Sequence, residues 1–508
     1  QITSIEEFFV DVLGNRGYAF AEVKGDTETI DDSNQVDLTF AVIPGKKTYT
    51  RKILFTGNHV TQDEVLRREM RQFEGAWSSN NSIEAGKVRL ERLGYFKEVN
   101  VETLPVVGTE DQIDIVYSVE EETTGSVGGN LGYSDFGLML GFNLQEQNFL
   151  GSGNTVGIGI NKNIYSESYN ISFVDPYATE DGVSLGYNIY FRETDYGEFN
   201  VANYLTNSNG LGAQFGYPIS DITRLGFSLT YDKTDIDIGT LPAREIYDFV
   251  AAEGNLFETL SAQASWQRVT LNRGLFPTSG SSTVLSLSAT IPGSDLNYYR
   301  ANIRQRYYRP LSNNFVFGFQ GELGYLNAYG DTEETPFFQN FYAGGPRSLR
   351  GFESNTLGPR STDAPCYEFN YEEETCPNLI DTDGDGVLDS PYINPYANTT
   401  SRYRDRPIGG NIKIEGSLQL IFKLPIIEDQ RSIRSAFFLD FGNVFSDNCR
   451  DYQINCYKPS VDDLRYSYGV GVTWITGFGP LSLAIAKPSN AGPQERTEEF
   501  QFTVGNVF

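Results

Sequence analysis

Hydrophobic and polar side chains alternate along several long stretches of the second half of the chain. In residues 315–325, aromatic and aliphatic side chains hold most of the odd positions, whereas Gln320 and Glu322 fall on the other face. The same period of two recurs in residues 285–291, 412–422 and 500–508. A period of two predicts β-strands with one apolar and one polar face.

Strand length and the chemistry of the polar face distinguish a membrane barrel from a soluble β-sandwich, which also alternates. Strands of ~10 residues with charged side chains on the inner face suit a water-filled lumen. Roughly sixteen such segments follow Gly125, and short turns alternate with longer polar loops, as in bacterial barrels. We therefore predict an all-β transmembrane barrel of about sixteen antiparallel strands over residues 123–508. The charged inner positions include Arg304, Arg306, Glu322 and Asp440.

The first region contains an internal repeat. The dipeptide Gly17-Tyr18 recurs as Gly94-Tyr95, and the alternating stretch 35–42 recurs at 112–119 with the same offset. Such a repeat indicates two copies of one packing module, and sheet edges in it could bind other proteins.

The second copy, residues 46–122, can be followed completely. Its periods predict the order β-α-α-β-β, with a capping box at Thr61 and a helix end at Gly94. The first copy, residues 1–45, holds only a last helix and two strands. Because such a partial unit leaves a sheet edge and core open, we expect the natural chain to extend upstream with more such α+β units.

Composition narrows the possible functions. The chain of 508 residues has 39 Lys and Arg against 67 Asp and Glu, a net charge of −28 that argues against a nucleic-acid partner. Its single histidine, His59, excludes sites that need two imidazoles, and no nucleophile–base arrangement is recognisable, so we expect no enzyme. The 31 Tyr, 35 Phe and 51 Gly suit a barrel with aromatic girdles and glycine turns.

The four cysteines form two close pairs in predicted external loops, Cys366 with Cys376 and Cys449 with Cys456. An even count at close spacing outside the cytosol predicts two local disulfides. A zinc site is the alternative interpretation, although neither spacing is Cys-x-x-Cys and no histidine is near.

A loop from about residue 329 to 408 is far longer than ordinary connections, which suggests a functional segment. Its centre matches most of a calcium-binding loop, but Tyr392 replaces the usual final Glu. The alternative is a solvated acidic loop tip, and we expect no other cofactor. The calcium ligands would be Asp381, Asp383, Asp385, the carbonyl of Val387, and Asp389.

Three stretches carry a resemblance to a known family. They are residues 65–77, residues 341–345 leading into the motif Leu349-Arg350-Gly351-Phe352, and the C-terminal residues 500–508. They resemble the BamA family of bacterial outer-membrane β-barrel assembly factors, which join periplasmic POTRA domains to a barrel. Leu349 stands where the family more often has Val.

The resemblance implies a fold in which residues 46–122 form a complete POTRA domain and 1–45 a partial one. It also implies that the long loop enters the lumen, where the motif acts as an anchor and Arg350 meets inward acceptors. Asp440 matches one acceptor position, while Gln419 stands where the family usually has Glu. Arg350 would then pair with one carboxylate and one neutral carbonyl, with Glu415 as a possible helper.

The resemblance further implies a function: the central insertase of the assembly machinery in the bacterial outer membrane. Its partners would be lipoprotein subunits of the complex, periplasmic chaperones, nascent barrel proteins and the lipid bilayer. No nucleic acid and no nucleotide would take part.

The mechanism would depend on the seam between the first and last barrel strands. Glycines lower strand stability and side-chain packing, and an open strand edge can template an incoming strand. We hypothesise that nascent barrel proteins add strands at this gate. The seam residues are Gly125, Gly128, Gly129, Gly132, Gly505 and Phe508.

Three other functions stay open at this point. A secretion translocator of the same superfamily would export a protein through the lumen. A passive porin would need no periplasmic repeats, and an outer-membrane enzyme would need catalytic residues that the sequence does not display.

Overall fold

The computed structural model divides the chain into two compact units. Unit 1 comprises residues 1–126 with 145–156, and unit 2 comprises 127–144 with 157–508. The structure describes residues 2–505 apart from 31–35, 135–136, 180, 198–200, 203, 221, 239–242, 363–405, 425–431, 452, 454–455 and 477–478.

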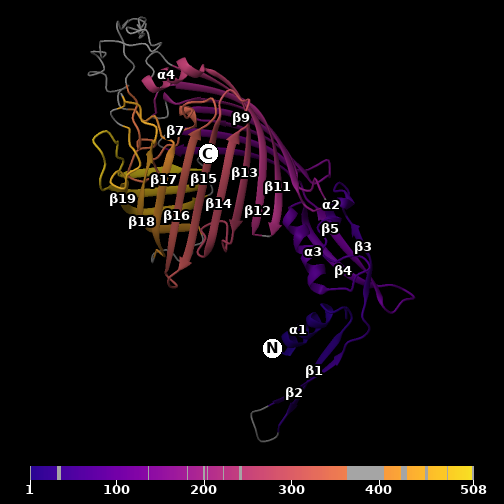
Figure 1. Cartoon of the computed structure of the whole chain (residues 1–508). Helices are drawn as coiled ribbons and strands as arrows, with labels where there is room; N and C mark the ends of the chain where they lie inside the picture. The colour runs from indigo at the N-terminus through magenta and orange to yellow at the C-terminus, as the bar shows by residue number, and fades with distance from the viewer. Residues whose placement is uncertain are drawn as a thin grey trace, which may run out of the picture. The chain divides into compact units, whose positions relative to one another are not determined.

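The complete repeat of unit 1 has the predicted β-α-α-β-β order. Its three-stranded sheet runs β3-β5-β4, with β3 parallel and β4 antiparallel to the central strand (Figure 1). Ile53, Leu66, Leu90 and Tyr117 are buried between the sheet and the helices. The elements are β3 (Tyr49–Thr56), α2 (Asp63–Arg67), α3 (Asn80–Leu93), β4 (Phe96–Pro105) and β5 (Gln112–Glu121).

In this repeat the end of α3 agrees with the prediction, whereas the start of α2 differs from it. Gly94 ends α3 at φ 70°, a left-handed conformation that glycine adopts without strain. The predicted capping box at Thr61 is wrong, because α2 begins after Gln62 without a side-chain cap. The carboxylate of Glu121, from the end of β5, instead accepts hydrogen bonds from the N–H groups of residues 59–61.

The partial repeat contains a helix and a two-stranded antiparallel hairpin, as predicted. They are α1 (Ile2–Gly14), β1 (Glu22–Thr29) and β2 (Val36–Ile43).

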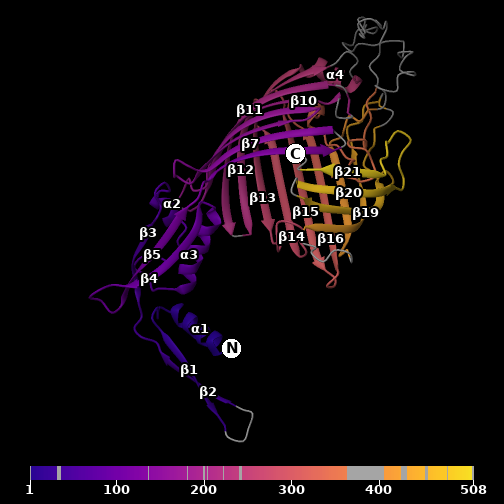
Figure 2. The same ribbon diagram turned by 180° about the vertical axis from the view of Figure 1, so that it is seen from behind.

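Unit 2 is built on a closed barrel of 16 strands, which confirms the predicted fold class. Consecutive strands are neighbours, and β21 returns to β6 to close the barrel. Figure 2 shows β19, β20 and β21 side by side from behind. The strands are β6 (Gly125–Ser134), β7 (Gly137–Phe149), β8 (Asn154–Lys162), β9 (Ser166–Asp175), β10 (Ser184–Asp195), β11 (Tyr204–Ser220), β12 (Thr223–Ile238), β13 (Leu256–Val269), β14 (Gly280–Thr290), β15 (Tyr298–Pro310), β16 (Phe315–Ala328), β17 (Ile412–Phe422), β18 (Ile433–Phe445), β19 (Arg465–Thr476), β20 (Gly479–Pro488) and β21 (Phe500–Val504).

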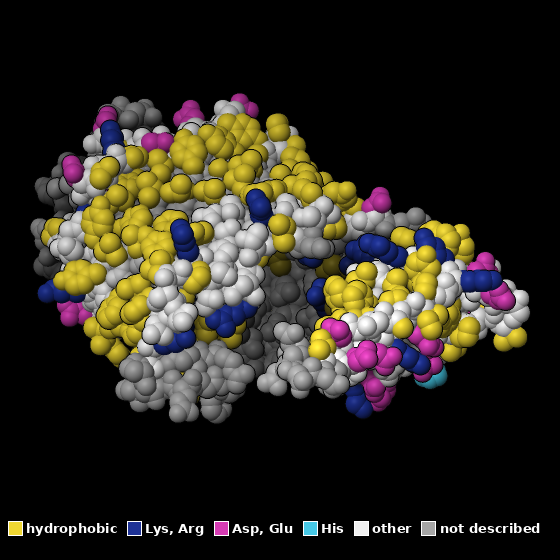
Figure 3. Space-filling view, turned by 90° about the horizontal axis from the view of Figure 1, so that it is seen from below, with side chains coloured by type: hydrophobic (Ala, Val, Ile, Leu, Met, Phe, Trp, Pro, Cys, Tyr) yellow, Lys and Arg dark blue, Asp and Glu magenta, His cyan; other side chains and the backbone are white. Residues whose placement is uncertain are grey.

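The alternation seen in the sequence places apolar side chains on the outer wall of the barrel. Leu287, Leu323 and Phe437 are each more than half exposed, and apolar groups cover much of the wall in Figure 3. Such an outer surface suits lipid rather than water. Among the described residues, no helix is long and apolar enough to cross a bilayer.

The loop between β16 and β17 packs against inward side chains of the barrel. Residues 329–362 include the short helix η2 (Phe337–Gln339). A buried cluster joins this loop to β16 and β18. The cluster consists of Leu326, Phe341, Ala343, Leu349, Phe352, Leu357 and Val444.

Unit 2 also contains the helix α4 (Arg244–Glu253). It lies in the connection between β12 and β13, where the sequence predicted only strands and turns.

Candidate functional site

The predicted anchor motif lies at the centre of the described part of the long loop. Leu349 and Phe352 are fully buried in the cluster that joins the loop to the barrel wall. Gly351 has φ 90°, and a Cβ there would lie 3.1 Å from the Cβ of Ala486 on β20. The motif is therefore held by apolar burial on both sides of Arg350, and the left-handed backbone of Gly351, close to Ala486, favours glycine.

Arg350 forms a bidentate ion pair with Asp440 of β18. Its Nε and Nη2 atoms each lie 2.7 Å from a carboxylate oxygen, and its backbone N–H donates to the same carboxylate at 3.2 Å. The Asp440 side chain is 0% exposed, and the guanidinium carbon lies 3.4 Å from the ring centroid of Phe438. Two parallel charge-assisted hydrogen bonds fix both the position and the orientation of Arg350.

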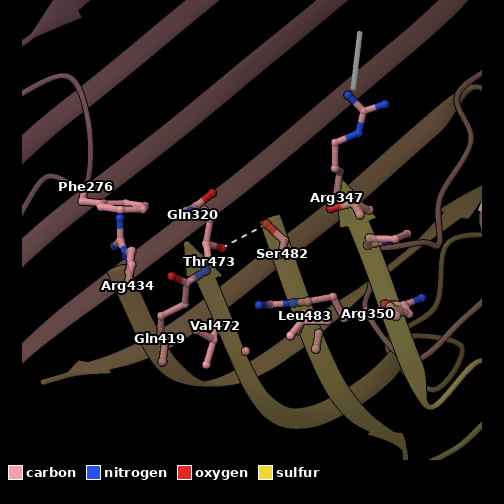
Figure 4. A pocket seen from close by; sticks show the side chains of 16 residues that line it. Phe276, Gln320, Arg347, Arg350, Gln419, Arg434, Val472, Thr473, Ser482 and Leu483 are labelled. Carbon is pink, nitrogen blue, oxygen red and sulfur yellow. Dashed lines mark hydrogen bonds between the residues drawn. The ribbon is translucent and has the colours of Figure 1, made fainter. Parts of the chain in front are cut away.

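The second acceptor of Arg350 differs from the residue that the sequence suggested. Nη2 donates at 3.0 Å to the hydroxyl of Ser417, which is paired directly with Asp440 across β17 and β18. Gln419 was the predicted second acceptor. Within the described residues, its amide donates to Ser417 at 3.2 Å instead, and it lines the same lumenal cavity as Arg350 (Figure 4).

Glu415 also serves a different partner from the predicted one. It accepts a hydrogen bond from Ser348, one residue before the motif, and forms an ion pair with Lys413 at 3.0 Å. Glu415 lies directly across from Glu322 of β16, and Lys413 is 3.7 Å from that second carboxylate. Lys413 therefore offsets the repulsion between two cross-strand acids, while Glu415 steadies the loop through Ser348.

Gln501 of β21 ties the motif to the last strand, a role that the sequence did not suggest. This side chain is 2% exposed, accepts from the N–H of Gly351 at 3.2 Å and donates to the carbonyl of Phe352 at 2.7 Å. Just before β21, Phe352 forms a β-bridge with Thr497. The only signal in the sequence is that Gln501 occupies the polar face of the final alternating stretch.

The seam is shorter than the pairing of β21 with its other neighbour, β20, which runs from Leu481↔Val504 to Ile485↔Phe500, and much shorter than pairs elsewhere in the barrel. Where the structure describes the last strand, β21 and β6 are paired at a single position, Val504 with Tyr133. In contrast, β19 and β20 are paired from Ser467↔Pro488 to Thr476↔Gly479.

The predicted seam glycines have different surroundings. Gly505 adopts φ 78°, and a Cβ there would lie 2.2 Å from the carbonyl oxygen of Leu131 and 3.0 Å from the Cα of Gly132. A Cβ on Gly129 would meet nothing within 4 Å, and one on Gly128 would meet only a backbone oxygen at 4.0 Å. A Cβ on Gly125 would lie 2.9 Å from the Glu146 carboxylate. Phe508 lies outside the described residues.

A disulfide joins Cys449 to Cys456 in the external loop after β18, as predicted. Within this closed loop, Arg450 forms an ion pair with Asp248 of α4 at 2.5 Å, and Gln453 donates to Glu245 of the same helix at 3.1 Å. Burial raises the pKa of the Glu245 carboxyl, partly offset by hydrogen bonds from Thr362 and Gln453.

Several predicted residues lie outside the described part of the chain. They comprise the second cysteine pair, Cys366 and Cys376, and the calcium loop of Asp381, Asp383, Asp385, Val387 and Asp389. Both predictions stay untested. Within the described residues, no group of three or more His, Cys, Asp or Glu side chains is placed to hold a metal ion.

Two family models match the chain. Residues 148–508 match the Omp85 superfamily domain, and residues 48–122 match the POTRA model, described as a surface antigen variable number repeat.

The outer membrane protein assembly factor BamA of Neisseria meningitidis is 30% identical over 535 residues, covering 100% of this chain and 62% of that protein. The human sorting and assembly machinery component 50 homolog is 22% identical, covering 92% of each chain. This chain thus spans less than two thirds of the length of the Neisseria relative.

Solved structures show the same architecture. A crystal structure of BamA from Haemophilus ducreyi lacking POTRA domains 1–3 superposes with a TM-score of 0.81 at 32% identity, covering 100% of this chain and 93% of that one. CdiB from Escherichia coli superposes with a TM-score of 0.54 at 12% identity, covering 99% and 83%, which indicates a shared fold alone.

Proposed function

Because the chain belongs to the Omp85 superfamily, we propose that it is the central insertase that folds and inserts β-barrel proteins into the bacterial outer membrane. The barrel lies in the outer membrane and the POTRA repeats are periplasmic. The observation that carries the proposal is the seam, where the described part of β21 pairs with β6 at one position.

The seam is the place where a new strand can be added at least cost. An unpaired strand edge presents N–H and C=O groups that need partners, and inside a bilayer each unsatisfied group costs several kcal/mol, on the order of the transfer of an amide to hydrocarbon. An incoming strand that pairs with β6 satisfies these groups. Folding of the client supplies the free energy, so the reaction needs no nucleotide and no cofactor.

The loop motif keeps the rest of this wall rigid while the seam opens. Arg350 holds β17 and β18 through Ser417 and Asp440, and Gln501 holds β21 through the motif backbone. The last strand is therefore fastened to the lumenal loop on one side and weakly paired with β6 on the other. This asymmetry favours an exposed edge on β6 rather than loss of β21.

The POTRA repeats would supply docking sites for partners. In the sheet of the complete repeat, β4 is an edge strand, and an edge strand can pair with an extended peptide. We propose nascent barrel proteins, periplasmic chaperones and lipoprotein subunits of the assembly complex as the partners that use such edges.

A disulfide across the seam tests the proposal. Tyr133→Cys with Val504→Cys joins the only described pair between β6 and β21, and we expect it to abolish client insertion into liposomes until it is reduced. The control is Leu483→Cys with Phe502→Cys, which joins β20 to β21 at a neighbouring pair and leaves the seam free. Full insertion activity with the seam locked would contradict the gate.

The same lock separates this function from a secretion translocator. Export through the lumen does not require the seam to open. A locked chain that still exports a protein but inserts none would favour the translocator.

A further inference from the structure

A cavity inside the barrel lies beside the anchor motif and is lined by residues of β16 to β21, of the long loop and of the turn that carries Phe276. Its volume is about 280 Å³, just below the roughly 300–1,000 Å³ of small-molecule sites. Of the 16 described residues that line it, three are arginines and none is an aspartate or a glutamate. This is unusual in a chain with a net charge of −28.

Arg434 of β18 presents an unused hydrogen-bond donor at this cavity. Its guanidinium carbon lies 4.7 Å from the ring centroid of Tyr308 and 6.0 Å from that of Phe276 (Figure 4). Its Nη2 atom is buried and has no hydrogen-bond partner among the described residues. A buried donor without an acceptor is costly, so such groups need an explanation, such as an absent ligand.

The aromatic side of the cavity rests on a strained turn. Phe276, between β13 and β14, has φ 48°, which is rare for a bulky residue. Backbone strain of this kind gathers at functional sites. Here it accompanies an aromatic ring placed near Arg434.

Arg350 contributes a second hydrogen-bond donor to the cavity. Its Nε and Nη2 atoms are engaged by Asp440 and Ser417, but Nη1 has no acceptor among the described residues. This Nη1 would lie 3.5 Å from a Cβ on Gly471, another residue of the cavity wall. Arg350 thus uses Nε and Nη2 to bind the barrel wall, while Nη1 lies beside the cavity.

We propose that this cavity binds a carboxylate carried by an apolar peptide segment. The two guanidinium atoms left open, Nη2 of Arg434 and Nη1 of Arg350, can each donate a charge-assisted hydrogen bond to a carboxylate oxygen. A phosphate dianion would leave several charged oxygens against Phe276, Ala436 and Ala484, whereas the group attached to a carboxylate can occupy that part of the cavity. The choice of a peptide as the source rests on the proposed function, since client polypeptides would be the ligands at hand.

Direct titration of the full chain in detergent tests this site. The probe is N-acetyl-dileucine with a free carboxylate, compared by calorimetry with the same peptide as its C-terminal amide. We expect the amide to bind at least about tenfold more weakly, because it loses the charge-assisted hydrogen bonds. Equal binding of acid and amide would overturn the proposal.

Matched arginine variants locate the site. Arg434→Gln should weaken binding at least about tenfold, whereas Arg306→Gln should leave binding unchanged, because Arg306 lies outside the cavity lining. Equal losses in both variants would indicate general charge attraction and overturn the site. Heat-modifiable electrophoretic mobility verifies that each barrel is folded, and Ser482→Asp, which leaves Arg434 intact and adds a negative charge to the lining, should also abolish binding.

Two further measurements complete the test. One distinguishes a peptide carboxylate from other anions, and the other distinguishes this site from the proposed gate at the seam. Inorganic phosphate or hexanoate that competes as well as the peptide would overturn the peptide assignment. The seam-locked chain, Tyr133→Cys with Val504→Cys, should bind the peptide with unchanged affinity. Failure of the gate and failure of this site would therefore be seen in different measurements.

Discussion

Arg350 combines a buried ion pair, a hydroxyl contact and an aromatic contact, so its removal should affect the fold as well as the activity. In Arg350→Ala the carboxylate of Asp440, which is 0% exposed, loses its cation. Leaving a buried charge uncompensated typically costs about 3–5 kcal/mol. We expect a correspondingly lower resistance of the barrel to guanidinium chloride, measured by loss of heat-modifiable mobility.

The control for this prediction is Arg306→Ala on β15, another lumenal arginine but an exposed one. Its loss should stay within about 0.5 kcal/mol, as for most surface substitutions. Exchanging the charges, with Arg350→Asp and Asp440→Arg, should recover part of the stability but not the contact with Phe438. Equal stability of the two alanine variants would show that the ion pair does not hold the loop.

At the scale of single residues, the sequence identified the charged pair of the anchor motif but not the neutral residues that bind the motif. Arg350 and Asp440 could be proposed because the resemblance to the assembly-factor family marks both positions. Ser417 and Gln501 could not, because their roles depend on strand register and on how deeply the loop enters the barrel. A serine or glutamine on a polar strand face carries no signal of its own.

Glycines at the seam offer a test at the scale of single strands. Gly505 ends β21 at φ 78°, and a Cβ there would lie 2.2 Å from the carbonyl oxygen of Leu131. Gly505→Ala should therefore disturb the seam, which would appear as a lower yield of the Tyr133→Cys/Val504→Cys crosslink. Gly129→Ala is the matched control, since a Cβ there has open space, and its crosslinking yield should be unchanged.

The start of α2 gives a prediction with a defined pH dependence. Partial burial raises the pKa of Glu121, but the hydrogen bonds from Thr61, Val60 and His59 outweigh burial and lower it. A lowered folded-state pKa means that the stabilisation is present above the ordinary Glu pKa, about 4.3, and is lost as the pH falls through the folded value. Hydrogen exchange of residues 59–67 in the full chain, corrected for intrinsic rates, should therefore accelerate in acid.

Substitution separates this cap from the neighbouring surface charge. Glu121→Gln should weaken the local structure by about 1 kcal/mol, as for lost helix caps, and remove the pH dependence. Glu120→Gln should have little effect, because Glu120 and Lys97 form an exposed pair. If exchange of residues 59–67 responds equally to both variants, the carboxylate of Glu121 is not the cap.

The helices and strands differed in how well they could be predicted from the sequence. In a barrel strand one face meets the water of the lumen and the other meets lipid. Polar and apolar side chains therefore alternate strictly, and the barrel strands could be predicted. The helix α4 was missed although Ile246 and Phe249 face one side of it, because a single amphipathic helix of 10 residues in a polar loop is a weak signal. The Glu121 cap was missed because it comes from a strand some 60 residues further along the chain.

For the whole barrel, the number of strands and the sidedness of the loops follow from counting alternating segments. The extent of pairing at the closure does not, because it depends on where β21 leaves the sheet relative to β6. Glycine content suggested weakness there but could not fix a register. The single described pair is thus information that only the folded chain contains.

Hydrogen exchange across the whole barrel in a bilayer should reveal this unequal closure. Amide protection follows the free energy of local opening, and β11 and β12 are paired from Tyr204↔Ile238 to Ser220↔Thr223. We expect β6 amides to exchange at least about tenfold faster than those of β11, since each missing hydrogen bond removes about 1 kcal/mol. The seam lock, Tyr133→Cys with Val504→Cys, should slow exchange in β6 and leave β11 unchanged. If β6 without the lock is as protected as β11, the barrel has no weak closure and insertion must use another route.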